Sequence, residues 1–392
     1  MKPHLPELLK HATLLTRDGD LLGATASIQA ALSAMTNNLG GSLGGGARAP
    51  SSHLAMSRPV QRGASEGSAL RDRQPIENGE FLTITLATPK GTRHGKLFVP
   101  AAYQGQAMPL MVMLHGCTQN PDDFAAGTGM NDLASEAGFF VLYPEQPPKA
   151  NGHRCWNWFE SAHQQRGKGE PALIAAMCQD VIAEYGIDAK RVYVAGLSAG
   201  GAMAAILGDA YPDIFAAVGV HSGLPTGSAS DVKSAFAVMQ GGSGSRSTKR
   251  PARTNTITNA DANARQNVRS AVATIVFHGD RDSTVAAVNG ERIAAACTGA
   301  LTRDGGAESV TNESVRSESA RTESVRSSTG STRSYTRTLY RDRDGKLICE
   351  HWLVHGAGHA WSGGQADGSF TDPQGPDASR EMVRFFLRGE HH

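Results

Sequence analysis

The sequence predicts an α/β fold with a mostly parallel central sheet and helices on both of its faces. Short β-branched and aromatic runs alternate with segments of helical spacing along much of the 392 residues. Several of these runs are continuously apolar, which is typical of strands that are covered on both sides. One such run, residues 191–195, passes directly into a glycine-rich turn and then into a helix-like segment. These observations together favour a parallel sheet over an all-β or all-α fold.

The individual elements follow from the same spacing rules. The expected strands are residues 81–87, 96–99, 109–114, 139–143, 191–195, 215–220, 273–277, 334–340 and 346–354, and the first two are expected to pair as a hairpin. The expected helices are residues 131–137, 170–185, 201–207, 285–297 and 379–388. Pro171 suits the first turn of the second helix, where its missing N–H costs no hydrogen bond.

The chain divides into three parts by composition. Residues 1–35 carry apolar positions at helical spacing on either side of Asp18-Gly19-Asp20, which predicts a helical hairpin. Residues 36–76 are rich in Gly, Ser, Pro and Arg and are expected to form a flexible linker. Residues 77–392 form the predicted α/β domain, with low-complexity insertions at about 240–256 and 302–334 that are expected to be irregular.

Charge and apolar patterning restrict the possible partners and location. Lys and Arg (38) nearly balance Asp and Glu (37), which argues against nucleic acid as a partner. No run of about 18 apolar residues is present, so no membrane span is expected. The N-terminal sequence lacks the pattern of a signal peptide, which favours a cytoplasmic location, with an extracellular one as the alternative. The sequence does not predict an oligomeric state.

The five cysteines are widely spaced and form no C-x-x-C pair. This pattern argues against a zinc ribbon and against a thioredoxin-like redox site. Reduced thiols are therefore expected by default, with one or two disulfides as the alternative if the protein is exported.

The turn at Gly196-Leu197-Ser198-Ala199-Gly200 carries the chemistry. A G-x-S-x-G turn between a strand and a helix holds its serine on a sharp bend with the hydroxyl exposed. The outer glycines leave room for strand and helix to pass closely. The Ala199 amide, at the helix N-terminus, then points to where negative charge forms on a substrate oxygen.

A serine hydroxyl needs a base, and the base needs an acid to orient it. Both follow Ser198 in the chain, directly after predicted strands, and the carboxyl ends of parallel strands meet at one edge of the sheet. The acid is Asp280 or Asp282, and the turn favours Asp282 because it lies further beyond the strand end. The base is His355 or His359, and the glycine-rich loop favours His359.

A metal site is the competing interpretation of the histidines, because His351, His355 and His359 lie four residues apart. The glycines Gly356 and Gly358 argue against the helix that such a site would need, and the H-E-x-x-H pattern is absent. We therefore expect no metal and no cofactor.

Two further segments are expected to line the site. The loop after residues 109–114 places the Cys117 amide as a second donor to the oxyanion, and His115 precedes it. Trp156 and Trp158, joined by Trp361 after His359, form either a buried aromatic cluster or a stacking wall for the substrate. We therefore take His115 and the three tryptophans as candidate substrate-binding residues.

The quoted motifs resemble those of the poly(3-hydroxybutyrate) depolymerase family of esterases, which also includes feruloyl and acetylxylan esterase-like members. The matching segments are LHGCTQN at 114–120, CWNW at 155–158, GLSAGG at 196–201, HGxxDxxV at 278–285 and GHxWxG at 358–363. The resemblance covers residues 77–388 apart from the insertions. It implies an α/β-hydrolase fold and a Ser198–Asp282–His359 triad, and it settles the choice of acid in favour of Asp282.

The function that the resemblance implies is hydrolysis of carboxylic esters through an acyl-enzyme. The expected substrates are hydroxyalkanoate polyesters or oligomers, or related short-chain or aromatic esters. Secreted members carry a signal peptide and often a substrate-binding domain, neither of which this sequence shows, so a small ester or oligomer is favoured. The alternatives are a peptidase of the α/β-hydrolase class, since the triad alone also serves peptides, and a non-catalytic granule- or partner-binding protein.

Overall fold

The computed structural model describes residues 79–88, 91–242, 272–301, 316–324, 333–342 and 345–387. The chain divides into two units, residues 1–75 and 76–392, and the described residues all belong to the second. The predicted helical hairpin and the whole of the predicted linker therefore lie outside the described residues. So do most of the two low-complexity tracts.

Within the described residues ten strands form one sheet, in the order β1-β2-β4-β3-β5-β6-β7-β10-β9-β8. Their bounds are β1 Glu80–Thr88, β2 Gly91–Val99, β3 Leu110–Leu114, β4 Phe140–Pro144, β5 Val192–Leu197, β6 Ala217–His221, β7 Ala273–Gly279, β8 Arg316–Ser324, β9 Ser334–Arg341 and β10 Leu347–Val354. A small parallel pair is formed by β11 Trp361–Ser362 and β12 Thr371–Asp372.

The helices in chain order are α3 Pro121–Thr128, α4 Met130–Ala137, the 3₁₀ turn η1 Ser161–His163, α5 Gly169–Tyr185, α6 Ala199–Ala210, α7 Val232–Met239, α9 Val288–Leu301 and α10 Ala378–Leu387. Local chemistry sets several of their ends. Asn120 caps α3 through the Asp123 amide, and Asp231 forms a capping box at α7. Gly186 ends α5 in the left-handed region, which glycine adopts without strain. No described helix is both long and apolar enough to cross a bilayer.

The centre of the sheet is parallel, as the sequence predicts. The six central strands pair parallel with one another in the order β4-β3-β5-β6-β7-β10. The pairs at the two sides of the sheet, β1–β2, β2–β4, β10–β9 and β9–β8, are antiparallel. The carboxyl ends of the parallel strands therefore meet at one edge. The segments that follow β3, β5, β6, β7 and β10 all begin there.

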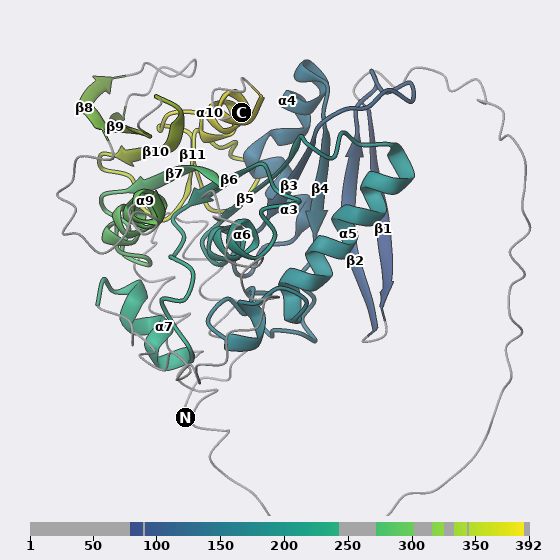
Figure 1. Ribbon diagram of the computed structural model, residues 1–392, viewed down its shortest axis with the longest axis horizontal. Coiled ribbons are helices and arrows are strands. Elements are labelled where there is room, and N and C mark those ends of the chain that lie inside the picture. The colour runs from purple at the N-terminus through teal and green to yellow at the C-terminus, as the bar shows by residue number, and fades with distance from the viewer. Residues whose placement is uncertain are drawn as a thin grey trace, which may run out of the picture. The chain divides into compact units, whose positions relative to one another are not determined.

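Helices cover both faces of the sheet (Figure 1). Alternate residues of β5 show why: Val192 and Val194 belong to the core under α5, α6, α7 and α9, whereas Tyr193 and Ala195 belong to the core under α3, α4 and α10. Every residue of β5 is buried. A strand covered on both sides needs apolar residues at every position, which explains the continuous apolar runs in the sequence.

The expected strands and the hairpin of the first two are all present, with boundaries that differ by a few residues, and the α/β fold is confirmed. One expectation needs correction. Residues 316–324, within the tract expected to be irregular, form strand β8 and pair antiparallel with β9. Backbone pairing with a neighbouring strand does not require an apolar face, so composition alone gave no signal for it.

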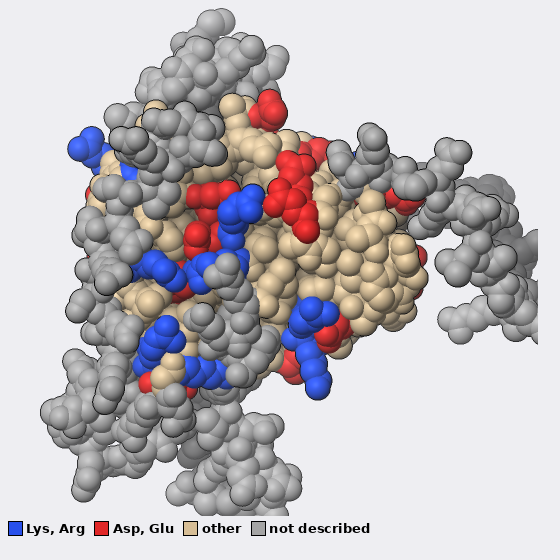
Figure 2. Space-filling model, turned by 90° about the horizontal axis from the view of Figure 1, so that it is seen from above, with Lys and Arg blue, Asp and Glu red and all other residues tan. Residues whose placement is uncertain are grey.

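Charged side chains of opposite sign lie next to one another on the face of the described chain that Figure 2 shows. This arrangement agrees with the nearly balanced charge of the sequence.

The first turn of α6 passes the end of β3 with no room for a side chain. A Cβ on Gly200 would lie 2.1 Å from the Leu114 carbonyl oxygen and 2.6 Å from that of His115. A Cβ on Gly196 would lie 2.4 Å from the Gly200 carbonyl carbon. Both glycines are thus required by backbone packing rather than by local flexibility.

We predict that Gly200→Ala lowers the free energy of unfolding by about 3 kcal/mol or prevents folding, because backbone atoms must move. Urea denaturation measures this change. Gly227→Ala is the matched control, since Gly227, unlike Gly200, has no atom within 4 Å of a Cβ, and only its φ of +72° opposes a side chain. The control should cost only about 1 kcal/mol of backbone strain. Equal losses for the two variants would contradict the close-packing argument.

Candidate active site

Ser198 occupies a strained bend between β5 and α6. Its φ of 57° and ψ of −118° lie in a region that residues with a side chain rarely adopt. Such strain costs about 1–3 kcal/mol and persists only where the surroundings impose it. Here the Ser198 N–H donates to the His221 carbonyl at 2.9 Å, and Gly200 packs against the end of β3.

The two candidate acids pair with the two candidate bases separately. The His359 Nδ1–H donates to Asp282 Oδ2 at 2.7 Å. Asp280 Oδ2 lies 3.0 Å from His355 Nδ1, and Asp280 Oδ1 accepts the Gly356 N–H at 2.7 Å. The Asp282 side chain is buried, whereas that of Asp280 is 35% exposed. The arrangement therefore favours Asp282 and His359 as the functional pair. Asp280 instead stabilises the loop after β10 through its contacts with His355 and Gly356.

Asp282 is fixed from two further directions. Its Oδ1 accepts the N–H groups of Thr284 and Val285 at 2.9 and 2.8 Å, and His278 Nε2 lies 3.5 Å from Oδ2. Burial alone would raise the pKa of Asp282, but the neighbouring His359 and His278 rings outweigh it and hold that pKa well below its usual range. Asp282 is therefore a carboxylate at neutral pH.

His221, at the end of β6, connects the serine to the histidine loop. Its carbonyl accepts from Ser198, and its ring Nε2 accepts the Ser362 N–H at 2.9 Å. The ring is thus neutral with its proton on Nδ1, which lies 3.3 Å from Ser222 Oγ. Burial lowers the pKa of His221 to about 3. Sequence reasoning missed this residue, because nothing in its spacing sets it apart.

Within the described part of the chain, no hydrogen bond joins the Ser198 hydroxyl to the His359 ring. His221 links the segments that carry them, because its carbonyl accepts the Ser198 N–H and its ring accepts the N–H of Ser362, three residues beyond His359. Catalytic hydrogen bonds of this kind are often long in a free enzyme and shorten when substrate binds.

The loop after β3 leaves one amide unused. The Gly116 N–H donates to Gln119 Oε1 at 2.9 Å, the Thr118 N–H donates to the His153 carbonyl at 2.7 Å, and the Gln119 N–H donates to the Gly116 carbonyl at 3.4 Å. The Cys117 N–H makes no hydrogen bond to any described residue. The Ala199 N–H opens α6 and has no partner inside the helix. These are the two amides that the sequence analysis selected as oxyanion donors.

His115 lies inside the protein with 1% of its surface exposed. Its Nε2 accepts the Gln146 N–H at 3.2 Å, so Nδ1 carries the proton and donates to the Gly116 carbonyl at 2.8 Å. Burial lowers the pKa of His115 to about 4. The buried ring supports the loop through these contacts, and its expected role in substrate binding stays a prediction.

The three tryptophans are also buried, with 3%, 5% and 1% of Trp156, Trp158 and Trp361 exposed. The Trp156 Nε1–H donates to the His115 carbonyl at 3.1 Å. Trp361 stacks on His221 at 5.1 Å between ring centroids and donates to Ser379 Oγ. Their burial favours the buried aromatic cluster over the stacking wall, the two alternatives that the sequence left open. Sequence alone cannot distinguish these roles, because both place aromatic rings beside the site.

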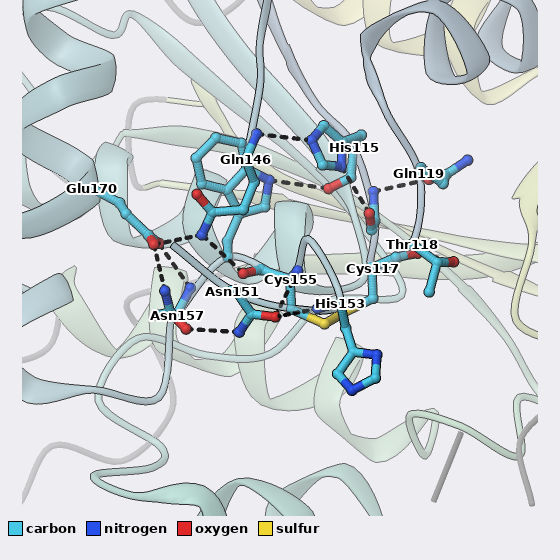
Figure 3. The surroundings of a disulfide bond; sticks show 12 residues. His115, Cys117, Thr118, Gln119, Gln146, Asn151, His153, Cys155, Asn157 and Glu170 are labelled. Atoms are coloured by element: carbon cyan, nitrogen blue, oxygen red, sulfur yellow. Dashed lines mark hydrogen bonds between the residues drawn. A yellow bond between two sulfur atoms is a disulfide. The ribbon is translucent and has the colours of Figure 1, made fainter. Parts of the chain in front are cut away.

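A disulfide joins Cys117 to Cys155, which corrects the expectation of reduced thiols for this pair (Figure 3). It links the loop after β3 to the loop after β4, and the Cα atoms of the two cysteines are 4.2 Å apart. Cys178, Cys297 and Cys349 are free. The Cys117 thiol, which the sequence analysis left without a role, thus anchors the residue whose amide is unused.

Glu170, the second residue of α5, binds the loop after β4 through several hydrogen bonds (Figure 3). Its Oε1 accepts from Gln146 Nε2 and from Asn157 Nδ2, both at 2.6 Å, and its Oε2 accepts the Asn157 N–H at 2.7 Å. Each of these side chains is buried. The carboxylate therefore binds residues on both sides of Cys155 in this loop. Sequence reasoning did not predict this role.

The strand order, the strained serine turn after β5 and the buried aspartate–histidine pair are those of an α/β-hydrolase fold. A family model described as Esterase PHB depolymerase matches residues 94–318, more than half of the chain. The chain belongs to this family. The matched region includes Ser198 and Asp282 and ends before His359.

Curated relatives agree with this assignment. Poly(3-hydroxyalkanoate) depolymerase C of Paucimonas lemoignei is 34% identical over 218 residues, which cover 55% of this chain and 51% of that protein. Poly(3-hydroxybutyrate) depolymerase of Ralstonia pickettii is 29% identical over 263 residues, which cover 65% and 48%. Feruloyl esterase B of Neurospora crassa is 37% identical over 116 residues, which cover 29% and 39%. The chain thus spans about half or less of these relatives.

Among solved structures, an acetyl xylan esterase from Aspergillus awamori aligns with 71% of this chain and 94% of its own. The sequence identity is 20% and the TM-score is 0.49.

We predict that the Cys117→Ser/Cys155→Ser double variant loses about 4 kcal/mol of unfolding free energy, because the bridge closes a loop with a sequence separation of 38. Thermal melts with and without dithiothreitol measure this. The reductant should lower the Tm of the wild type and leave that of the double variant unchanged. A reductant effect of equal size on both proteins would contradict a stabilising disulfide.

We predict that stability falls with acidity between pH 6.5 and about 4, because unfolded His115 and His221 bind protons there and the folded rings do not. The expected slope is up to about 1.4 kcal/mol per pH unit for each ring. Urea denaturation at several pH values measures it. His221→Gln, which retains an acceptor for the Ser362 amide, should remove one ring's share of the slope; an unchanged slope would contradict the buried neutral ring.

Proposed function

We propose that this protein is a serine carboxylic-ester hydrolase that works through an acyl-enzyme. The observation that carries the proposal is the serine on the strained elbow beside a buried, hydrogen-bonded aspartate–histidine pair. Membership of an esterase family supports the choice of esters over other acyl compounds.

The proposed first half-reaction forms the acyl-enzyme. Ser198 Oγ attacks the ester carbonyl carbon while His359 Nε2 accepts the hydroxyl proton. Asp282 holds the Nδ1–H and stabilises the imidazolium that results. The C=O electron pair moves to oxygen, where the amides of Cys117 and Ala199 donate to it. Each such donor is worth about 3 kcal/mol of transition-state stabilisation. When the C–O bond of the ester breaks, His359 returns the proton to the departing alcohol.

The second half-reaction repeats these steps with water. His359 takes a proton from water as its oxygen attacks the acyl carbon, and the second tetrahedral species uses the same two amides. Collapse releases the carboxylic acid and restores the Ser198 hydroxyl. Entry of the substrate shortens the distance between the Ser198 hydroxyl and the His359 ring, which share no hydrogen bond in the free protein.

The proposed substrates are hydroxyalkanoate oligomers or polyesters, or related short-chain or aromatic esters. Relatives named as hydroxyalkanoate depolymerases and as a feruloyl esterase support this range. The Cys117–Cys155 disulfide supports the extracellular alternative for location over the cytoplasmic one, because disulfides persist in oxidising compartments.

Replacement of the triad tests the mechanism. We predict that Ser198→Ala, His359→Gln and Asp282→Asn each lower kcat for p-nitrophenyl butyrate by about 10³–10⁶-fold, with Asp282→Asn the least affected. The matched control is Asp280→Asn, which removes the other histidine-paired carboxylate and should retain activity within about tenfold. Turnover by Ser198→Ala equal to that of the wild type would refute the serine mechanism.

A substrate panel tests the specificity. Values of kcat/KM for 3-hydroxybutyrate oligomers, methyl ferulate, acetylated xylan and a dipeptide p-nitroanilide rank the candidate acyl groups. We expect an ester to be preferred over the anilide by at least about 10²-fold. Preference for the anilide would favour the peptidase alternative.

A further inference from the structure

We propose that Gln119 is a positioning residue that aims the Cys117 amide at the oxyanion and couples that amide to the loop carrying His359. The inference rests on the proposed esterase function. It concerns a side chain that lies two residues beyond the proposed donor and is itself 2% exposed.

Gly116 is held at both of its backbone groups. Its N–H donates to Gln119 Oε1 at 2.9 Å (Figure 3). Its carbonyl accepts the Gln119 N–H at 3.4 Å and the His115 Nδ1–H at 2.8 Å. The Gly116 carbonyl and the Cys117 N–H belong to one planar trans peptide, in which C=O and N–H point in opposite directions. The Gln119 side chain thus fixes the peptide before Gly116, while the Gln119 N–H and the His115 ring fix the peptide after it. With Gly116 held on both sides, the direction of the Cys117 N–H is set, and loss of the side-chain contact frees one side to rotate.

The Gln119 amide cannot rotate freely. Its Nε2 donates to Asp123 Oδ2 at 2.9 Å and to the Ser369 carbonyl at 3.0 Å. A flip of the amide would turn its oxygen toward these two acceptors and its NH₂ toward the Gly116 N–H. Acceptor would then face acceptor and donor would face donor, so these hydrogen bonds would be lost. The acceptor for Gly116 is thus set by its partners on the other side.

Those partners belong to two other segments. Asp123 lies in the first turn of α3, and its Oδ1 and Oδ2 accept from the Ser369 N–H at 2.8 Å and the Ser369 hydroxyl at 2.6 Å. The neighbouring Phe370 carbonyl accepts the Trp361 N–H at 2.6 Å, two residues beyond His359. Hydrogen bonds and short stretches of backbone therefore connect the loop of the proposed oxyanion donor to the segment that carries the proposed base.

The functional consequence is geometric. The oxyanion forms only in the tetrahedral species, so a misdirected Cys117 amide weakens binding of the transition state more than binding of the ester. Loss of the Gln119 contacts should thus lower kcat with little change in KM. A side chain that only stabilised the fold would instead lower the Tm and the fraction of active molecules.

The test compares Gln119→Leu with the wild type after titration of active sites with a fluorophosphonate. The variant should show kcat lowered by about 10–100-fold per active site, with KM for p-nitrophenyl butyrate within about threefold. The Ki of butylboronic acid, which mimics the tetrahedral species, should rise in parallel. Thr371→Val is the matched control, because it removes a hydrogen bond to Gly368 in the same segment without touching Gln119. It should retain the wild-type kcat.

Two further variants cover a failure of Gln119→Leu to fold. Gln119→Glu keeps the acceptor for Gly116 but loses the donor to Asp123, and Ser369→Ala removes one hydroxyl from Asp123. Both should lower kcat in the same direction by a smaller factor. Values of kcat per active site within about twofold of the wild type in the folded variants would overturn the inference, as would an unchanged Ki for the boronic acid. Wild-type protein that neither hydrolyses esters nor reacts with the fluorophosphonate would instead overturn the proposed function.

Discussion

The contact between the first turn of α6 and the end of β3 is the constraint on which the site depends. Backbone meets backbone there, since a Cβ on Gly200 would lie 2.1 Å from the Leu114 carbonyl oxygen. This approach places the amide at the start of α6 beside the loop that follows β3. It also holds Ser198 in a backbone conformation that the residue would not adopt alone. The turn at Ser198 and the loop that holds the proposed oxyanion donor Cys117 are thus positioned by one packing contact.

Buried polar side chains transmit that constraint to the rest of the edge. His115, Gln119 and Glu170 are each almost wholly buried, and each bonds to a group in another segment of the chain, namely Gln146, Ser369 and Asn157. Removing one partner from such a network leaves another polar group unsatisfied in a low-dielectric interior. The loops at this edge of the sheet are therefore held in place by hydrogen bonds between buried polar groups as well as by apolar packing. The disulfide adds a covalent link at the point where these hydrogen bonds converge.

Much of the fold and of the candidate site followed from sequence. Continuous apolar runs predicted the buried strands, and the residues that follow these strands included the candidates Ser198, Asp282 and His359. The choice between Asp280 and Asp282 needed more, because both follow β7 and both bind a histidine. In the structure Asp282 differs from Asp280 in its burial and in its contact with His278, and burial depends on the packing of distant segments.

The remaining features were not predictable for related reasons. The pairing of Cys117 with Cys155 depends on two loops 38 residues apart meeting in space. The tryptophans are adjacent to the site in either interpretation, so only their exposure identified them as support. Gln119 and His221 carry no local signal, since their roles exist only through partners elsewhere in the chain.

The covalent bridge has one more consequence for the chain as a molecule. Between the two bridged cysteines lie α3, α4 and β4, so these elements sit inside a closed ring of polypeptide. A protease that cut once anywhere inside that ring would produce two fragments that stay attached through sulfur. Denaturing electrophoresis without reductant would still detect one species of full mass, and only reductant would reveal the nick.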